Sequence, residues 1–317
     1  AAAAALPGLA VYPMPIQTAS ETEAVYLFNA DTGKTILNQN ADQQQYVASL
    51  TKLMTALLLL ESGKDLNGEV TVPTALTQEF RDIQNANGTT MGLRIGETVR
   101  RIDLLNAMLI VSANDAASVI AYDVGGSVLD FVKQMNARAQ ELGCTGTHFA
   151  NTHGLHDEEH YTTARDLAKI MMAALEYEKF QEIYSADRYT LAATNLQEER
   201  ILVTTNYLID ASITSDYYDE RVIGGKTGFT TPAGRCVMCV AESGNLRYLC
   251  VVLGASSTGA DGSTYFGSFV SASEALDFGF DSFTFAEVLS PLAPIAQLPV
   301  AHATQSVVVT PAESVTT

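Results

Sequence analysis

The stretch that decides the fold runs from residue 236 to residue 255 and reads CVMCVAESGNLRYLCVVLGA. Two apolar runs, Cys236–Glu242 and Leu246–Ala255, flank the turn residues Ser243-Gly244-Asn245. Apolar runs rich in β-branched residues on either side of a short Gly/Asn turn predict an antiparallel hairpin. The sequence therefore predicts an antiparallel sheet in the second half of the chain.

The hairpin carries three of the four cysteines of the chain, which are Cys144, Cys236, Cys239 and Cys250. Four cysteines are too few for a disulfide scaffold in a chain of this length. Cys236 and Cys239 have Cys-x-x-Cys spacing, but no second such pair exists, and in a strand they face opposite sides. We therefore expect neither a redox nor a metal role. A two-residue turn at Gly244-Asn245 would place Cys239 opposite Cys250.

Further elements extend outward from the hairpin in both directions. They are a strand, turn and strand over Ala24–Phe28 and Thr35–Leu37, a buried helix over Ser49–Leu60, a helical region from Leu66 to about Glu199, renewed strand character from Arg221, and a closing helix over Ser271–Phe278. Strands thus occur at both ends of the core and helices lie between them. This order predicts an α+β fold, in which one antiparallel sheet flanked by helices receives an inserted all-helical subdomain.

Two helix starts inside the insert are marked by capping patterns. Ser127 with Asp130, and Thr163 with Asp166, place a hydroxyl residue three positions before an acidic one. Apolar residues follow each pair at helical spacing. Both patterns predict amphipathic helices that begin directly after the hydroxyl residue.

Composition excludes several classes of protein. The chain has 317 residues, of which 47% are hydrophobic and 17% charged, so there is enough apolar material for a core. The net charge of -18 argues against nucleic acid as a partner, because phosphate binding needs clustered Lys and Arg. No apolar run reaches the ~20 residues that span a bilayer. Membrane association is therefore expected only through segments absent from this chain.

The ends differ in composition from the core. Residues 1–22 open with AAAAALPG, small residues that fit the region around a signal-peptidase site of an exported protein and fit equally a flexible tail without a function. Residues 281–317 are rich in Pro, Ser, Thr, Ala and Val, and Val307–Val309 is a candidate strand. We expect this segment to be a linker or the start of a truncated C-terminal β domain. Between them, residues 23–280 form the predicted main domain, with an α/β part at about 23–65 and 200–280 and the helical insert at about 66–199.

Ser49-Leu50-Thr51-Lys52 stands at the start of the first predicted helix. Residues three apart share a helix face, so the Lys52 amine can reach the Ser49 hydroxyl. A serine hydroxyl is a poor nucleophile until a base takes its proton, and a lysine with a lowered pKa can be that base. The alternative interpretation is a capping serine and a solvated lysine.

Two further motifs follow in chain order. Ser112-Ala113-Asn114 lies between two predicted helices and supplies a hydroxyl and an amide. Lys226-Thr227-Gly228, followed by Phe229, lies at the start of strand material, where a charge and a hydroxyl suit a carboxylate and Gly admits a ligand to the strand. Singly, these triplets are typical of a helix cap and a turn. Together with Ser-x-x-Lys, in this order, they form the signature of β-lactamases and penicillin-binding proteins.

From about Glu23 to Phe280 the sequence resembles the serine-type D-alanyl-D-alanine carboxypeptidases, the low-molecular-mass penicillin-binding proteins. The resemblance rests on the three motifs and on four further stretches: Met91–Val99, Ser112–Ala117, Asn151–Leu155 and Thr162–Ala168. Residues Lys226–Thr230 and Ala233–Cys236 resemble the Gram-positive branch. The resemblance implies a β-lactamase/transpeptidase-like fold. It also implies an exported enzyme of the cell envelope that trims peptidoglycan stem peptides for cell wall organisation and cell shape, needs no cofactor or metal, and is inhibited by β-lactams.

Residue by residue, the resemblance assigns three catalytic roles. It makes Ser49 the acylated nucleophile and Lys52 its general base, and has Ser112 pass a proton to the leaving D-alanine. Asn114 would hold Lys52 and the substrate backbone.

The remaining roles in the resemblance concern substrate binding. Lys226 and Thr227 would bind the terminal carboxylate, and Gly228 belongs to the same strand motif. The backbone N–H groups of Ser49 and Phe229 would form the oxyanion hole. One departure from the family is His156 after Leu155, where Asp is common in relatives, and it falls in a predicted surface loop.

Three alternative functions fit the sequence less well. A β-lactamase needs a deacylating Glu in a Glu-x-x-Leu-Asn loop, and no such motif occurs between Asn151 and Gly225. A β-lactam sensor that stays acylated usually sits behind transmembrane segments, which this sequence lacks. A zinc peptidase is suggested by His156–His160 (HDEEH), but the required order is His-Glu-x-x-His on a helix, and we predict a solvated polar loop there.

Overall fold

The centre of the protein is one five-stranded antiparallel sheet. The structure, a computed structural model, describes residues 20–284, 287–289, 296–299, 306–309 and 315–316. The strands of the main sheet are β1 (Ala24–Asn29), β2 (Thr35–Gln39), β7 (Val222–Thr230), β8 (Gly234–Ser243) and β9 (Leu246–Ala255). Their order is β2-β1-β9-β8-β7, and every neighbouring pair is antiparallel. The N-terminal hairpin thus docks beside the C-terminal one, as the two-ended strand pattern predicted.

The β8–β9 hairpin has the register that its turn predicted. Ser243 pairs with Leu246 across the turn, and Cys239 pairs with Cys250. Cys236 belongs to the core cluster on one face of the sheet, whereas Cys239 and Cys250 belong to the cluster on the other. Opposite faces for Cys236 and Cys239 are thereby confirmed, and all four cysteines are buried as free thiols.

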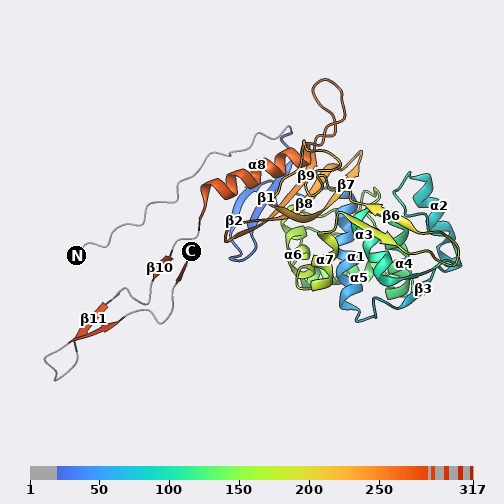
Figure 1. The fold of residues 1–317 in the computed structure, drawn as a ribbon, viewed down its shortest axis with the longest axis horizontal. Helices are drawn as coiled ribbons and strands as arrows, with labels where there is room; N and C mark the ends of the chain where they lie inside the picture. The colour runs from blue at the N-terminus through green and yellow to red at the C-terminus, as the bar shows by residue number, and fades with distance from the viewer. Residues whose placement is uncertain (1–19, 285–286, 290–295, 300–305, 310–314, 317) are drawn as a thin grey trace.

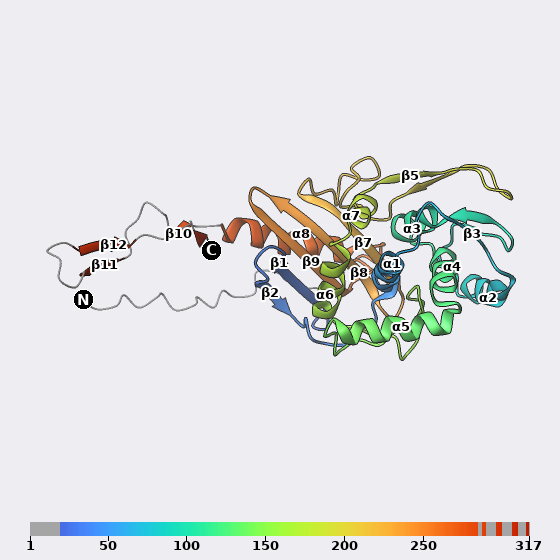
Figure 2. The ribbon, with the colours of Figure 1, turned by 90° about the horizontal axis from the view of Figure 1, so that it is seen from below.

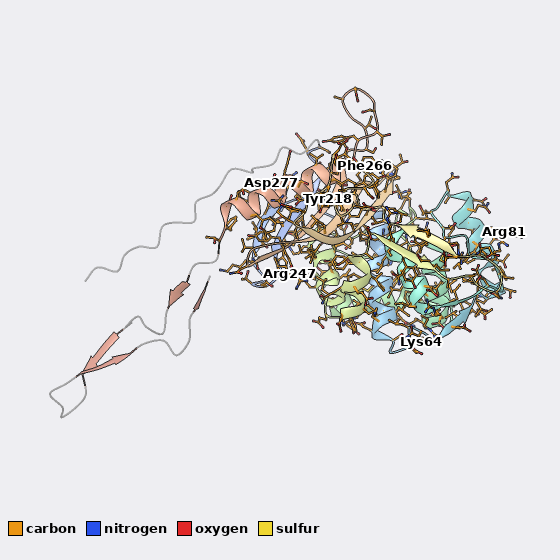
Figure 3. All side chains as sticks on the ribbon, in the orientation of Figure 1. Lys64, Arg81, Tyr218, Arg247, Phe266 and Asp277 are labelled. Carbon is orange, nitrogen blue, oxygen red and sulfur yellow. The ribbon has the colours of Figure 1, made fainter. Side chains whose placement is uncertain are left out.

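Helices cover both faces of the sheet (Figures 1 and 2). The helices are η1 (Ala48–Thr51), α1 (Lys52–Glu61), η2 (Thr74–Leu76), α2 (Thr77–Asn85), α3 (Arg101–Ile110), α4 (Asn114–Gly125), α5 (Val128–Glu141), α6 (Ala164–Ala174), α7 (Glu178–Tyr184) and α8 (Gly267–Ser282). Helix α8 packs on β9, β8 and β1 from one side, and α6 packs on β9 and β1 as part of the helical body on the other side. In Figure 3, Asp277 on α8 and Arg81 on α2 mark the two ends of this arrangement.

The insert between β2 and β7 requires one correction, because it is not all-helical. It also holds two short antiparallel pairs, β3 (Glu69–Thr71) with β4 (Thr98–Arg100) and β5 (Arg188–Leu191) with β6 (Arg200–Val203). Strands of three or four residues with few buried side chains leave too short an apolar alternation to be detected in the sequence.

The predicted helix starts are confirmed. The Ser127 hydroxyl accepts a hydrogen bond from the backbone N–H of Asp130 at the start of α5, and the Thr163 hydroxyl does the same for Asp166 at the start of α6. The candidate strand at residues 307–309 lies in β12 (Ser306–Val309), which pairs with β11 (Ala296–Pro299), while β10 (Glu287–Leu289) pairs with β13 (Val315–Thr316). Residues 1–19 lie outside the described part of the chain. Among the described residues, no helix has the length and apolar character that crossing a membrane requires.

Candidate active site

Ser49 and Lys52 lie on one turn at the junction of η1 and α1. Ser49 belongs to η1 and is partly exposed, whereas Lys52 is the first residue of α1 and its side chain is buried. The Lys52 Nζ donates to the Ser49 Oγ at 2.9 Å. The geometry that Ser-x-x-Lys spacing predicted is thus present, and the interpretation of Lys52 as a solvated surface lysine is wrong.

The Lys52 ammonium has two further acceptors besides Ser49. Its Nζ lies 2.6 Å from the Asn114 Oδ1 and 2.6 Å from the backbone oxygen of His153. Burial in the protein interior holds the pKa of Lys52 well below its usual value, and the nearby Lys226 charge adds to this effect while Asp115 opposes it. A lowered pKa makes the neutral amine accessible, and its lone pair can then accept the Ser49 proton.

Asn114 is held in place by its position at the start of α4. Its backbone N–H donates to the Thr89 oxygen at 2.8 Å. The next residue, Asp115, accepts hydrogen bonds from the backbone N–H groups of Met91 (3.0 Å) and Leu93 (2.9 Å). A carboxylate in the first turn of a helix is favoured by the helix dipole, so Asp115 fixes the helix end that presents Asn114 to Lys52.

Ser112 connects α3 to α4 in an unusual backbone conformation. Its φ is 64°, in the left-handed region that costs a serine free energy. The side chain is almost fully buried, and its Oγ has no hydrogen-bond partner among the described residues. The structure therefore does not join Ser112 to Lys52 or Ser49 by a hydrogen bond, and its proton-transfer role stays a prediction.

Lys226 and Thr227 lie on β7, one of the two edge strands of the main sheet. The Lys226 side chain is buried, and its Nζ donates to the Thr227 backbone oxygen at 2.8 Å. Burial lowers the pKa of Lys226 to about 7. The Thr227 Oγ1 lies 2.6 Å from the Thr205 Oγ1, on the segment between β6 and β7. Lys226 thus acts on the pKa of Lys52, and Thr205 orients the Thr227 hydroxyl.

Gly228 brings β7 close to the nucleophile. A Cβ at this position would lie 3.0 Å from the Ser49 backbone nitrogen and 3.0 Å from the Val47 oxygen, so a larger residue would force the strand away. Phe229 follows with 46% of its surface exposed, and its ring stacks on the Arg235 guanidinium at 4.5 Å. The backbone of residues 228–229 therefore borders Ser49, where the predicted oxyanion hole requires it.

His153 is a site residue whose role residue-type reasoning missed. The side chain of this buried histidine lies 3.4 Å from the Glu79 carboxylate, and its backbone oxygen accepts the hydrogen bond from the Lys52 Nζ. The adjacent Gly154 has φ 89°, and a Cβ there would lie 1.8 Å from the Ala48 oxygen. The sequence did contain a signal for this contact, namely the glycine of the Asn-Thr-His-Gly-Leu stretch. Only Gly permits the backbone to approach η1 this closely.

The HDEEH loop is only partly a solvated loop, which corrects the sequence prediction. Residues 156–159 are exposed, but His160 is buried. Its Nε2 lies 2.6 Å from the Thr51 Oγ1, and its Nδ1 accepts from the backbone N–H groups of Ala150 and Asn151. Both ring nitrogens are thereby engaged in anchoring the loop to η1. Among the described residues, no group of three or more His, Cys, Asp or Glu is arranged to hold a metal.

Comparison with known proteins agrees with this geometry. Residues 13–257 match the family model described as D-alanyl-D-alanine carboxypeptidase. The Bacillus subtilis D-alanyl-D-alanine carboxypeptidase DacF is 33% identical over 244 residues, which are 76% of this chain and 59% of that protein. An Escherichia coli D-alanyl-D-alanine endopeptidase is 29% identical over 75% of this chain and 74% of its own length.

Solved structures show the same fold. The Streptomyces K15 DD-transpeptidase matches with a TM-score of 0.71 at 27% identity, over 81% of this chain and 96% of that one. A D-alanyl-D-alanine carboxypeptidase from Mycobacterium tuberculosis matches with a TM-score of 0.72 at 27% identity, over 86% and 95%. The chain spans 59% and 64% of the lengths of two curated relatives, DacF and the Haemophilus influenzae DacA. On the family match and the shared fold, the chain belongs to the D-alanyl-D-alanine carboxypeptidase family of serine hydrolases.

Proposed function

We propose that this protein is a D-alanyl-D-alanine carboxypeptidase that removes the terminal D-alanine of peptidoglycan pentapeptide stems through an acyl-enzyme on Ser49. The observation that carries the proposal is the 2.9 Å contact between Ser49 Oγ and a buried Lys52 whose pKa is strongly lowered. Family membership and the relatives' names support the same reaction class. No second function is favoured by an observation.

Acylation follows from the arrangement around Ser49. The Lys52 amine takes the Ser49 hydroxyl proton while Oγ attacks the carbonyl carbon of the penultimate D-alanine. The backbone N–H groups of Ser49 and Phe229 stabilise the oxyanion, each worth typically ~3–4 kcal/mol in sites of this kind. The proton then passes to the leaving D-alanine amine by way of Ser112, and the peptide remains as an ester on Ser49.

Deacylation returns the enzyme to its starting state. A water molecule attacks the Ser49 ester and gives up a proton to Lys52, which releases the shortened peptide and restores the Ser49 hydroxyl. Asn114 keeps the Lys52 Nζ in place through both steps by its 2.6 Å hydrogen bond. A β-lactam would acylate Ser49 in the same way and act as an inhibitor.

Residues of strand β7 bind the terminal carboxylate of the substrate. Lys226 provides a cation when protonated and Thr227 a hydroxyl held by Thr205. An amidated C-terminus cannot satisfy both groups, and leaving them unpaired in a desolvated site costs about 1–3 kcal/mol or more. The substrate therefore ends in a free carboxylate. Such stems occur outside the cytoplasmic membrane, so we propose a secreted enzyme acting in the cell envelope and in cell shape.

The test is release of D-alanine from matched pentapeptides that end in D-Ala-D-Ala acid or in the corresponding amide. We expect the acid to be hydrolysed and the amide to react at least about tenfold more slowly in kcat/KM. The Ser49→Ala variant is the control for contaminating peptidases. Equal rates for acid and amide would show that Lys226 and Thr227 do not read the carboxylate, and an active Ser49→Ala protein would exclude the acyl-enzyme.

A further inference from the structure

Two of the three acceptors that bind the Lys52 amine belong to segments outside α1. They are the Asn114 Oδ1 at the start of α4 and the backbone oxygen of His153 in the loop between α5 and α6, each 2.6 Å from the Lys52 Nζ. The third acceptor, the Ser49 Oγ, is the group that the amine deprotonates. The first two acceptors therefore decide where the amine lies relative to Ser49, and the contacts that hold them in place matter for the reaction.

Glu79 on α2 touches the supports of both acceptors. Its Oε1 lies 3.4 Å from the His153 Nε2 and accepts a hydrogen bond from the Ser118 Oγ at 2.9 Å. Ser118 follows Asn114 by four residues, so the two side chains share one face of α4. One carboxylate oxygen thus connects the loop of His153 to the helix of Asn114, and α2 packs beside α4 (Figure 2).

The imidazole ring of His153 is held in one tautomer. Its Nδ1 accepts the backbone N–H of Leu155 at 3.2 Å, so the ring proton is on Nε2 and faces the Glu79 carboxylate. Burial lowers the pKa of His153, so the ring is neutral at pH 7. The contact with this ring lowers the pKa of Glu79, so the carboxylate is charged. A neutral donor that faces a charged acceptor makes a charge-assisted contact, which fixes the ring.

The loop of His153 has a second anchor, which lies on another side. The Thr152 backbone oxygen accepts a hydrogen bond from the Thr55 Oγ1 at 2.6 Å, and this bond ties the loop to α1. Glu79 ties the same loop to α2 and α4, the side from which Asn114 reaches the amine. Without the Glu79 side chain, this connection between the two acceptors of the amine is lost, and the acceptors are free to shift relative to each other.

Glu79 acts on where the Lys52 amine lies. The low pKa of Lys52 has other causes: burial is the largest, the charge of Lys226 lowers the pKa further, and the charge of Asp115 raises it. Replacing the Glu79 carboxylate by a neutral group of the same shape should therefore preserve the base, whereas removing the side chain should displace it.

We propose that Glu79 is a positioning residue that keeps the two acceptors of Lys52 at a fixed distance from each other, through His153 on one side and Ser118 on the other. The inference rests on the proposed function, because it assumes that Lys52 takes the Ser49 proton. Loss of the Glu79 contacts misplaces the amine and slows proton transfer, while the carboxylate-binding residues of β7 stay where they are. The effect therefore falls on kcat and on the acylation rate, and KM stays the same.

The experiment measures kcat and KM for D-alanine release from the free-acid pentapeptide, and the acylation rate at saturating benzylpenicillin. We expect Glu79→Ala to lower kcat and the acylation rate about tenfold with KM within about twofold, because a reacting group is misplaced. Glu79→Gln keeps an oxygen acceptor for the His153 ring and the Ser118 hydroxyl, so kcat should recover to within about twofold of the wild type. The matched control is Asp82→Ala, which removes an exposed carboxylate from the same helix and should leave both rates unchanged.

Ser118→Ala tests the same claim with a conservative change. It removes the hydrogen bond to the Glu79 carboxylate, and we expect kcat to fall about threefold. In the double variant Glu79→Ala/Ser118→Ala the two losses should not add, because Ser118 acts through Glu79. Melting temperatures of all variants show whether each protein is folded at the temperature of the assay.

Three results would overturn the inference. Wild-type kcat in folded Glu79→Ala would show that the reaction does not use the contacts of Glu79. A Glu79→Gln protein as slow as Glu79→Ala would show that the charge matters and the positioning does not. Additive losses in the double variant would show that Ser118 does not act through Glu79. Failure of the proposed function is distinct from all three, because the wild-type protein itself would then neither release D-alanine nor be acylated.

Discussion

Lys226 and Lys52 are electrostatically coupled: the charge on Lys226 helps to lower the pKa of Lys52, although burial of Lys52 is the larger cause. The two lysines reach the site from β7 and α1, which lie far apart in the sequence. The two lysines need opposite protonation states. Lys52 must be neutral to accept a proton, and Lys226 must be charged to bind a carboxylate.

The coupled lysines predict a bell-shaped pH profile of kcat/KM for the free-acid pentapeptide. The rate rises with pH as Lys52 loses its proton and falls at higher pH as Lys226, with a pKa of about 7, becomes neutral and stops binding the carboxylate. Lys226→Arg keeps its charge at all accessible pH values, so the falling limb should move well above pH 9. A falling limb that stays near pH 7 in this variant would assign it to another group.

Lys52→Ala should reduce the rate of β-lactam acylation about 10²–10⁴-fold, because it removes the general base. Lys52→Arg is the matched control: it keeps a cation at the site but cannot lose its proton, so it should be as slow as the alanine variant. Stopped-flow acylation measures both. An Arg variant with near wild-type rates would mean that the charge of Lys52, and not its basicity, is what the reaction uses.

Gly228→Ala should slow acylation while leaving the fold intact. The added methyl group would meet the Ser49 nitrogen and the Val47 oxygen at 3.0 Å, so β7 must move away from η1 by a few tenths of an ångström. A shift of this size misplaces the backbone donors, and we expect a loss of about tenfold or more in the acylation rate. Unchanged kinetics together with an unchanged melting temperature would show that residue 228 does not set the distance between the strand and the nucleophile.

His160 makes the fold sensitive to acid. Burial lowers the pKa of His160 to about 3, whereas an unfolded histidine titrates near 6.5. Between these values the unfolded state binds more protons, so the free energy of unfolding should decrease as the pH falls from 6.5 toward 3. Urea unfolding at pH 7 and pH 5 should show a smaller decrease for His160→Gln than for the wild type. An identical decrease in both proteins would locate the acid sensitivity elsewhere.

Much of this fold and part of the site could be predicted from the sequence. The hairpin register followed from Ser243-Gly244-Asn245, and the contact of Ser49 with Lys52 followed from helical spacing, because both depend on residues close in the chain. The strands β3 to β6 were missed because strands this short, with few buried residues, carry no clear alternation of apolar and polar residues. The pairing of β3 with β4 also joins residues far apart in the chain, such as Val70 and Val99.

The missed site residues share a physical cause. His153 acts through its backbone oxygen, which no residue type reveals, and Thr205 is defined only by its contact with Thr227 from a different segment. The sequence predicts a solvent-exposed His160 because residues 156–159 are polar. The hydrogen bond to Thr51 offsets the cost of burying the imidazole ring. Each of these contacts joins segments distant in the chain, which local patterns do not show.

The measurement that tests the central claim most directly is peptide mass spectrometry of the protein after incubation with benzylpenicillin. Opening of the β-lactam ring by a serine loses no atoms, so the modified peptide should gain the full mass of the antibiotic. We predict that the adduct lies on the peptide spanning Ser49 and is absent from Ser49→Ala. An adduct on Ser112, or an unmodified wild-type protein, would contradict the assignment of Ser49 as the nucleophile activated by Lys52.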